Sequence, residues 1–251
     1  KAKEREMKVL VHALFPVGEA GGAQRLFSEA AKGMRPVDVE LEERGCKGCH
    51  TITPLKNCPN CGAQTRSTGK MRRMPLDMRA LFEPAARKME LPQGTKVKGV
   101  KGMLSETKIP EPIEKGILRA KHGLSVFKDG TIRFDITDAP LTHFKPREIG
   151  LTVKKARELG YDTDCQGKPL ESPEQAVELR PQDVIVSKSG VEYLFRIAQF
   201  LDELLVRFYN TEPYYDVKKP EDMIGQALLG LSPHTSGGVC CRLIGHTQAS
   251  V

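Results

Sequence analysis

The sequence predicts an α+β protein in which β-rich regions carry helices at their periphery. Hydrophobic residues make up 39% of the 251-residue chain and charged residues 28%, which is typical of a globular protein. Short segments with strand-like alternation are interspersed with segments of helical periodicity. A chain of 251 residues is long enough for one large domain or two ordinary ones.

The first forty residues predict two strands and one short helix. Residues 8–15 are apolar, rich in β-formers and followed by Pro16, which favours a buried strand. Residues 23–32 have the pattern of a short helix that ends at Gly33, and residues 37–41 alternate like a strand. The glycine-rich turn before the helix matches neither common phosphate-binding glycine motif, so we interpret it as a chain reversal.

The middle of the chain predicts β-structure. Glycine and proline punctuate residues 94–140, which we expect to form strands and loops. Residues 124–127 and 131–135 flank the turn-forming Lys128-Asp129-Gly130 and predict a β-hairpin. One buried face of this hairpin would hold Leu124, Val126, Ile132 and Phe134.

The last hundred residues predict three helices and a strand. Residues 152–159 form a short helix that Gly160 ends, and Ser172-Pro173 with Gln175 has the pattern of a helix-starting capping box. Residues 183–187 predict a strand. Apolar side chains recur at helical spacing over residues 193–209, which indicates a core helix.

Positive charge is concentrated in one segment. The formal net charge is +7, and residues 66–101 contain ten basic and three acidic residues, so this segment accounts for the whole excess. Such a block favours a phosphate-rich partner, with nucleic acid as the leading candidate and a solvated surface as the alternative. Binding through it should be sensitive to salt.

Four cysteines give the sharpest local motif, two CxxC pairs within GCKGCHTITPLKNCPNCG. Four thiolates on two tight turns satisfy the tetrahedral preference of zinc, and a site filled by protein ligands is structural rather than catalytic. We therefore predict a zinc ribbon whose ligands are Cys46, Cys49, Cys58 and Cys61. We expect His50, Cys165 and the pair Cys240-Cys241 to take no part in it.

Basic residues follow this ribbon in two groups. Arg72 and Arg73 come soon after the cysteines, and Lys96, Lys98 and Lys101 lie in GTKVKGVKGM, where glycines allow close approach of a ligand to the backbone. All five are candidate phosphate contacts, and a solvated surface is again the alternative. In an extended segment Lys96 and Lys98 share a face that Lys101 does not, unless a glycine bends the chain.

Other short motifs point to no enzyme class. Asp162 and Asp164 form a DxD that could hold Mg²⁺, but a plain loop is the better interpretation because it follows Gly160 among polar residues. No metal-binding spacing is found among His12, His122, His143, His234 and His246, and no serine nucleophile motif is present. After Asp222 there is no acidic residue, so the last 29 residues cannot by themselves hold a carboxylate-bound metal.

The termini and the hydropathy suggest a cytoplasmic piece of a longer protein. No stretch reaches the roughly 18 apolar residues of a membrane span, and the charged N-terminus lacks a signal-peptide core, so we expect no membrane partner. Because the chain begins with Lys1 and shows no helix stop or polar tail at its end, we expect a fragment.

Several long motifs resemble one known family. LVHALFPVGEAGGAQR, the four-cysteine ribbon, GTKVKGVKGM, the stretch from KIPEP to PREIG and GLSPHTSGGVCCRLIGHT occur in this order. Together they resemble the large subunit of archaeal family D DNA polymerases, also called DNA polymerase II, from about Val9 to Val251.

The resemblance implies a fold and a function. It implies a polymerase core of double-psi β-barrels with zinc modules, acting on a DNA primer–template and deoxynucleoside triphosphates beside a small subunit with 3′→5′ exonuclease activity. It matches Lys98 and Lys101 to active-site lysines that hold phosphates, and the four cysteines to a zinc module. It also matches residues 234–238 to a His-Thr-Ser-x-Gly stretch without a secure role.

The same resemblance divides the chain into five regions. Residues 1–44 would be a β-rich core segment, 45–66 the zinc ribbon, and 67–150 the lysine loop with barrel strands. Residues 151–222 would be a mixed segment with the helix 193–209, and 223–251 the start of a second barrel.

One departure bears on the mechanism. The family's catalytic aspartates lie downstream of the position that matches Val251, so this chain would lack the ligands for two catalytic Mg²⁺ ions and be inactive by itself. The alternative function is a non-catalytic zinc-ribbon module that binds nucleic acid. A transferase that uses Asp162 and Asp164 is a remote third.

Overall fold

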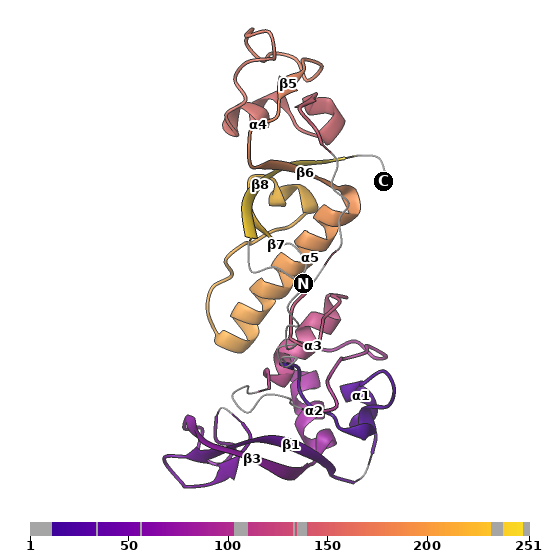
Figure 1. Cartoon of the computed structure of the whole chain (residues 1–251), viewed down its shortest axis with the longest axis vertical. Coiled ribbons are helices and arrows are strands. Elements are labelled where there is room, and N and C mark those ends of the chain that lie inside the picture. Colours follow the sequence, from indigo (N-terminus) through magenta and orange to yellow (C-terminus); the bar gives the residue numbers. More distant parts are fainter. Residues whose placement is uncertain are drawn as a thin grey trace, which may run out of the picture. The chain divides into compact units, whose positions relative to one another are not determined.

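The computed structural model describes residues 12–33, 35–55, 57–102, 110–132, 134, 140–231 and 238–247. Its helices and strands are labelled in Figure 1, and they fall into two compact units. Unit 1 comprises Lys1–Arg133 with Glu203–Glu212, and unit 2 comprises Phe134–Asp202 with Pro213–Val251. Both units mix helices with sheets, as the sequence predicts.

A long antiparallel ribbon dominates the β-structure of unit 1. Strand β1 (Val37–Cys46) pairs with β3 (Thr65–Leu76) on one side and with the short β2 (Ile52–Thr53) on the other (Figure 1). Val39 and Leu41 point to one face of β1 and are buried. The strand predicted at residues 37–41 is therefore confirmed, and it continues to the first cysteine.

Three α-helices accompany this ribbon. They are α1 (Phe27–Ala30), α2 (Met78–Lys88) and α3 (Ile113–Lys121), and a 3₁₀ turn, η1 (Glu19–Gly21), precedes them. The Asp77 side chain caps α2 by accepting a hydrogen bond from the Ala80 N–H at 2.9 Å. Phe27 of α1 stacks on Phe82 of α2 with ring centroids 5.1 Å apart.

Several predictions for unit 1 need correction. Residues 12–15 form no strand, although Leu14 and Phe15 are buried, and residues 8–11 lie outside the described ranges. The helix expected at residues 23–32 shrinks to four residues because Leu26 forms an antiparallel bridge with Lys98. Residues 94–140 are not all strands and loops, since the apolar pattern around Ile117 buries one face of α3.

The predicted hairpin of unit 1 is present in a minimal form. Val126 and Ile132 form an antiparallel bridge across the turn, and the Phe127 N–H donates to the Thr131 carbonyl at 3.0 Å. The expected common buried face is only partly realised, because Leu124 is buried whereas Phe134 is exposed.

Unit 2 contains a small two-stranded sheet with its own core. Strand β4 (His143–Phe144) pairs with β5 (Val177–Glu178), next to η2 (Pro146–Ile149) and α4 (Val153–Glu158). Thr152 caps α4, which ends before Gly160, so the helix predicted at residues 152–159 is confirmed. The buried cluster of this region includes Tyr161, Leu170 and Ile244.

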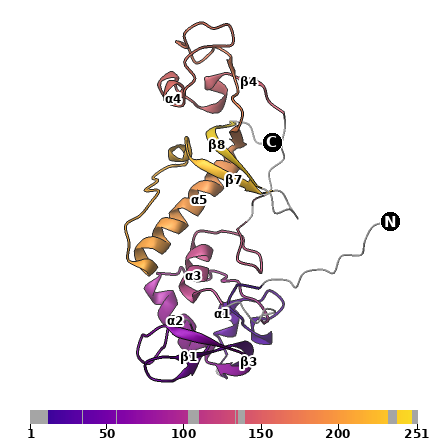
Figure 2. The same cartoon turned by 60° about the vertical axis from the view of Figure 1, so that its left-hand side comes forward.

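The second sheet of unit 2 has the strand order β6-β8-β7. Strand β6 (Asp183–Ser187) runs parallel to β8 (Gly238–Thr247), and β7 (Ala227–Leu231) runs antiparallel to it. The helix α5 (Lys188–Leu204) follows β6 directly and lies beside β7 and β8 in Figure 2. Val186, Ala198 and Leu243 pack together between helix and sheet.

Two helix predictions for unit 2 are wrong in different ways. The Gln175 side chain accepts hydrogen bonds from the N–H groups of Glu171 and Ser172, as a capping box would. No helix begins at Ser172, however, because β5 begins two residues after Gln175. The core helix starts at Lys188 instead of residue 193, and after Leu204 it continues as a π-helical turn, η3 (Leu205–Tyr209). Another short turn, η4 (Pro220–Met223), leads into β7.

The strands of the described residues form three separate sheets of three, two and three strands. The mixed α and β organisation is thus confirmed, and the double-psi β-barrels and the five-region division stay predictions. Residues 234–237 of the His-Thr-Ser stretch lie outside the described residues. Among the residues with described structure, no helix combines the length and apolarity that a membrane span needs.

Candidate functional site

The four cysteines of the ribbon converge on one point. Cys46 ends β1, and the other three lie in the loops that connect β1, β2 and β3. The four sulfur atoms all lie within 4.8 Å of one another, with Cys46 Sγ 3.4 Å from Cys61 Sγ and Cys49 Sγ 3.4 Å from Cys58 Sγ. Each CxxC pair therefore contributes one thiol to each of the two close contacts.

The local backbone explains why these side chains converge. The Cys46 N–H donates to the Thr51 carbonyl at 3.0 Å, and the Cys58 N–H donates to the Ala63 carbonyl at 2.8 Å. These bonds close two equivalent loops. The residue after each CxxC pair, His50 or Gly62, has a positive φ, of 58° and 73° respectively, which turns the chain back.

Hydrogen bonds favour the thiolate form at two of these cysteines. The Thr51 hydroxyl lies 3.1 Å from Cys49 Sγ, and hydrogen bonds from Thr51 lower the pKa of Cys49 to about 6. Backbone hydrogen bonding from Cys49 and then from Gly48, whose N–H donates to Cys46 Sγ at 3.3 Å, lowers the pKa of Cys46 as well. At Cys61, by contrast, a backbone hydrogen bond at Ala63 lowers the pKa, but the contacts with the neighbouring thiols outweigh it and raise the pKa to about 12. Thiolates are the form that binds metal.

The cluster has the size of a zinc site. Zinc–sulfur bonds of about 2.3 Å in a tetrahedron place the sulfur atoms about 3.8 Å apart, which matches the spacing found here. All four positions would be protein ligands, and Cys46 and Cys58 are buried whereas the other two are exposed. His50 and Cys165 contribute no ligand atom to this cluster.

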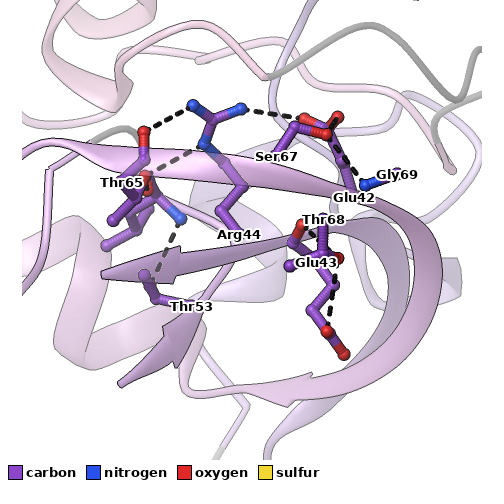
Figure 3. A network of polar contacts seen from close by, with 9 residues as sticks. Glu42, Glu43, Arg44, Thr53, Thr65, Ser67, Thr68 and Gly69 are labelled. Atoms are coloured by element: carbon purple, nitrogen blue, oxygen red, sulfur yellow. Dashed lines mark hydrogen bonds and ion pairs between the residues drawn. The ribbon is translucent and has the colours of Figure 1, made fainter. Parts of the chain in front are cut away.

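A polar network joins the strands β1 and β3 near the end that carries Cys46 (Figure 3). Arg44 donates through Nε to the Thr65 hydroxyl at 3.0 Å and through Nη2 to the Thr65 carbonyl at 2.9 Å, while Nη1 donates to Glu42 at 3.0 Å. The Ser67 hydroxyl donates to the other oxygen of Glu42. The Glu42 side chain is only 6% exposed, so this charge depends on these partners.

The lysine segment forms the second candidate site, next to the glycine-rich turn before α1. Lys98 bridges to Leu26, Val100 bridges to Pro16, and the Gly99 N–H donates to the Arg25 carbonyl at 2.7 Å. A Cβ on Gly99 would lie 2.6 Å from the Phe15 carbonyl oxygen, so only glycine permits this close approach.

The two central lysines have different partners. Lys98 Nζ donates to the Gln24 side-chain oxygen at 3.1 Å, whereas Lys101 Nζ donates to both carboxylate oxygens of Glu19 at 3.0 and 2.9 Å. Lys96 is exposed and lies on the same segment. Gln24 and Glu19 were not anticipated from the sequence, because partners more than seventy residues away leave no local signal.

The arginines of β3 do not share one face. Arg72 pairs in register with Leu41, and Arg73 pairs with Glu40, so their side chains point to opposite sides of the strand. Both are exposed, and Arg72 forms an ion pair with Glu43 at 3.5 Å. A single flat ligand surface therefore cannot contact both in the same way.

Asp162 and Asp164 lie in a loop of unit 2, as the sequence predicts. One Asp164 oxygen accepts the N–H groups of Gln166 and Lys168, and the other accepts from Gln175 Nε2 at 3.0 Å. The Gln175 bond, ahead of these backbone bonds, lowers the Asp164 pKa. Because both oxygens stabilise the turn, this carboxylate serves the loop and is not set up as a metal ligand.

Comparison with known proteins places these sites in a family. Residues 90–251 match the family model "DNA polymerase II large subunit DP2, catalytic domain", and residues 1–80 match "DNA polymerase II large subunit DP2, central domain". The chain belongs to the DNA polymerase II large subunit family. The cysteine cluster falls in the central-domain match and the lysine segment in the catalytic-domain match.

Individual relatives agree over the whole chain. The chain is 46% identical over 250 residues to the DNA polymerase II large subunit of Methanothermobacter thermautotrophicus, covering 100% of this chain and 23% of the relative. It is 48% identical over 279 residues to that of Archaeoglobus fulgidus (99% and 24%) and 44% identical over 280 residues to that of Pyrococcus abyssi (100% and 19%). The chain thus spans about a quarter of the length of these relatives or less.

Proposed function

We propose that this chain is part of the catalytic large subunit of a replicative DNA-directed DNA polymerase. The observation that carries the proposal is the catalytic-domain match over residues 90–251, which contains the lysine segment. The substrates would be a DNA primer–template and deoxynucleoside triphosphates. A small subunit with 3′→5′ exonuclease activity would complete the enzyme.

Within that enzyme, Lys98 and Lys101 would hold phosphate groups of the template, the primer or the incoming nucleotide. Both ammonium groups reach solvent, and neither is buried in a permanent ion pair, so both can exchange their present partners for phosphate oxygens. Lys96, Arg72 and Arg73 would add exposed charge that attracts the DNA backbone. Such contacts position nucleic acid without reading its sequence.

Catalytic Mg²⁺ would supply activation of the primer hydroxyl and stabilisation of the leaving pyrophosphate. We propose that its carboxylate ligands come from outside these 251 residues, because the described residues gather no group of three carboxylates and Asp164 is committed to its own turn. The chain by itself would then bind DNA without extending a primer.

The cysteine cluster would hold structural zinc. With four thiol ligands in tetrahedral spacing, no position is left for water or substrate, so the ion would not act in the chemical step. Its role would be to fix the end of the β1–β3 ribbon, where the basic side chains of β3 begin.

Primer extension tests the proposed function. The complete large subunit with its small subunit is assayed with Mg²⁺, comparing wild type with Lys98→Ala, Lys101→Ala and the double variant. We expect each substitution to slow extension while zinc content and unfolding are unchanged. Lys32→Ala is the matched control, since Lys32 is an exposed lysine paired with Glu29 on α1.

The outcomes separate this proposal from its alternative. If the lysine variants extend primers as fast as wild type, the lysines are only a basic surface. If the complete wild-type complex extends no primer but binds DNA, the alternative of a non-catalytic zinc-ribbon module is favoured. The observation that supports that alternative is that β3, which carries exposed arginines, begins opposite Cys46 of the cysteine cluster.

A further inference from the structure

We propose that the glycine-rich turn before α1 is part of the phosphate site, with Gln24 positioning Lys98 and Glu19 occupying Lys101 until a phosphate replaces it. This inference rests on the proposed function of the two lysines. It assigns a role to a turn whose glycine spacing matches no common phosphate-binding motif.

The turn is fixed in register against the lysine segment. The Val17 N–H donates to the Val100 carbonyl at 2.8 Å, and the Gly18 N–H donates to the Lys101 carbonyl at 3.1 Å. A Cβ on Gly21 would lie 2.4 Å from Val17 Cγ2, so the turn packs too closely for any larger residue there. Glu19 and Gln24 therefore face the two lysines from a rigid backbone.

Gln24 orients Lys98 without neutralising it. Lys98 Nζ lies 3.1 Å from the Gln24 side-chain oxygen and 3.5 Å from its main-chain oxygen. Both acceptors are neutral, and an ammonium group has three donors, so Lys98 keeps its charge and at least one free donor for an anion. Lys98 is thus held in place as a side chain that can bind a phosphate.

Glu19 holds Lys101 differently, as a replaceable anion. Both carboxylate oxygens accept hydrogen bonds from Lys101 Nζ, and the two side chains are 83% and 59% exposed. Exposed ion pairs of this kind contribute little stability, so a phosphate can displace the carboxylate at small cost. The carboxylate marks the position that a phosphate oxygen pair would take.

The released carboxylate has space and a second cation nearby. Glu19 lines a surface hollow of about 600 Å³ together with Ala30, Arg35 and Asp38. Arg35 and Asp38 are both exposed, so a released Glu19 carboxylate would meet one positive and one negative side chain in this hollow. The exchange therefore moves one side chain and leaves the backbone of η1 in place.

Charge-neutralising substitutions in the complete two-subunit enzyme test the inference. We expect Glu19→Gln to tighten primer–template binding or to lower the nucleotide KM by about two- to five-fold, because it removes a competitor for Lys101. We expect Gln24→Glu to weaken primer–template binding or to raise the nucleotide KM by about two- to five-fold, because the new carboxylate neutralises Lys98. Gln24→Met should give a smaller loss, since it removes orientation but adds no charge.

Glu29→Gln is the matched control for net charge. It removes the same negative charge from an ion pair on the neighbouring α1, with Lys32 in place of Lys101. A second control places Glu19→Gln in a Lys101→Ala background, where it should have no effect.

Three results would overturn the inference or its basis. Equal effects of Glu19→Gln and Glu29→Gln would show that only the net charge matters. An effect of Glu19→Gln that persists in the Lys101→Ala background would show that the Glu19–Lys101 ion pair plays no part. Either result leaves the proposed function standing. If Lys101→Ala itself leaves primer extension unchanged, the proposed function of Lys101 is wrong, and the inference that rests on it is wrong as well.

Discussion

At the scale of single residues, the two positions after the CxxC pairs show how backbone conformation serves the metal site. His50 and Gly62 occupy equivalent left-handed positions. This conformation costs an L-residue roughly 1–2 kcal/mol, although histidine tolerates it better than most, and costs glycine almost nothing. His50 thus carries a strain that Gly62 avoids.

This difference gives a prediction for stability. We expect Gly62→Ala to lower the free energy of unfolding of the zinc-loaded protein by about 1 kcal/mol. His50→Gly should raise it by about 0.5 kcal/mol, because relief of strain is partly offset by the extra freedom of glycine in the unfolded chain. Denaturant unfolding measures both, with Gly33→Ala as a control whose φ is not positive. A loss on His50→Gly as large as that on Gly62→Ala would show that the histidine side chain itself is needed.

A buried phenol provides the clearest pH-dependent group. The Tyr161 hydroxyl donates to Asp183 at 2.6 Å, and Arg242 holds the same carboxylate through bonds of 2.9 and 2.7 Å. Burial, with the bond to Asp183, raises the Tyr161 pKa to about 12.

The raised pKa sets the direction of the pH effect. An exposed tyrosine titrates at a pKa of about 10, so the folded protein binds this proton more tightly than the unfolded chain does. The stabilisation is complete below about pH 10 and is lost as the pH rises toward about 12. We expect Tyr161→Phe to remove this component and to cost about 1 kcal/mol at neutral pH. The free energy of unfolding, measured across the pH range, checks this. Tyr214 is 78% exposed, so Tyr214→Phe should lose stability with rising pH as the wild type does.

At the scale of elements, the β1–β3 ribbon depends on a charge pair that sequence patterns do not indicate. Glu42 and Arg44 lie two residues apart on β1, where a register irregularity separates their pairings with β3. Their side chains are 6% and 11% exposed, so each charge needs the other. The pair fixes the end of the ribbon that carries Cys46.

Breaking this pair should loosen the metal site. Arg44→Leu leaves the Glu42 carboxylate buried without a cation, and we expect a loss of about 3–5 kcal/mol together with faster release of zinc to a chelator. The double variant Glu42→Leu/Arg44→Leu should lose less than the single one, because no charge is left buried alone. Arg79→Leu, which breaks an exposed pair with Glu83 on α2, should stay within about 0.5 kcal/mol. Equal losses in the single and double variants would contradict this account.

Prediction of the elements succeeded where local signals are strong. The strand at residues 183–187 and the helix capped by Thr152 were predicted from local patterns, and both formed. At Ser172 only one half of the capping box formed, the bond from the Ser172 N–H to the Gln175 side chain. The chain then entered β5, which pairs with β4, instead of a helix. The helix α3 was missed because proline and glycine around it suggested loops, whereas burial of Ile117 and Leu118 stabilises the helix.

At the scale of the whole molecule, charge and site residues are unevenly distributed. The basic segment of residues 66–101 and the cysteine cluster both belong to unit 1, whereas Asp162, Asp164 and the strands β6–β8 belong to unit 2. If the proposed function holds, unit 1 therefore supplies the electrostatic attraction for DNA.

This distribution predicts the salt dependence of DNA binding. If Lys98 and Lys101 each neutralise one phosphate, the double variant Lys98→Ala/Lys101→Ala should reduce the slope of log affinity against log salt by about 1.8. Lys154→Ala/Lys155→Ala in unit 2 should leave the slope unchanged. Binding of duplex DNA to the complete large subunit over a range of salt concentrations measures both slopes. Equal reductions in the two variants would indicate that the charge acts without a specific position.

Features that depend on near neighbours could be predicted from the amino-acid sequence. The four cysteines that converge in the structure could be named from spacing alone, because two CxxC pairs contain the geometry of their own turns. The excess of positive charge could be located by counting. The motifs also indicated the family, which the matches over residues 1–80 and 90–251 confirm.

Features that depend on distant partners became visible only in the folded chain. Lys98 and Lys101 could be named from the sequence, but Gln24 and Glu19 come from a turn more than seventy residues away. Likewise, Arg44 contacts Thr65 across the sheet, and Tyr161 meets Asp183 only after unit 2 has folded. These contacts have no local signal because hydrogen bonds and ion pairs between distant segments form only where packing brings the backbones together.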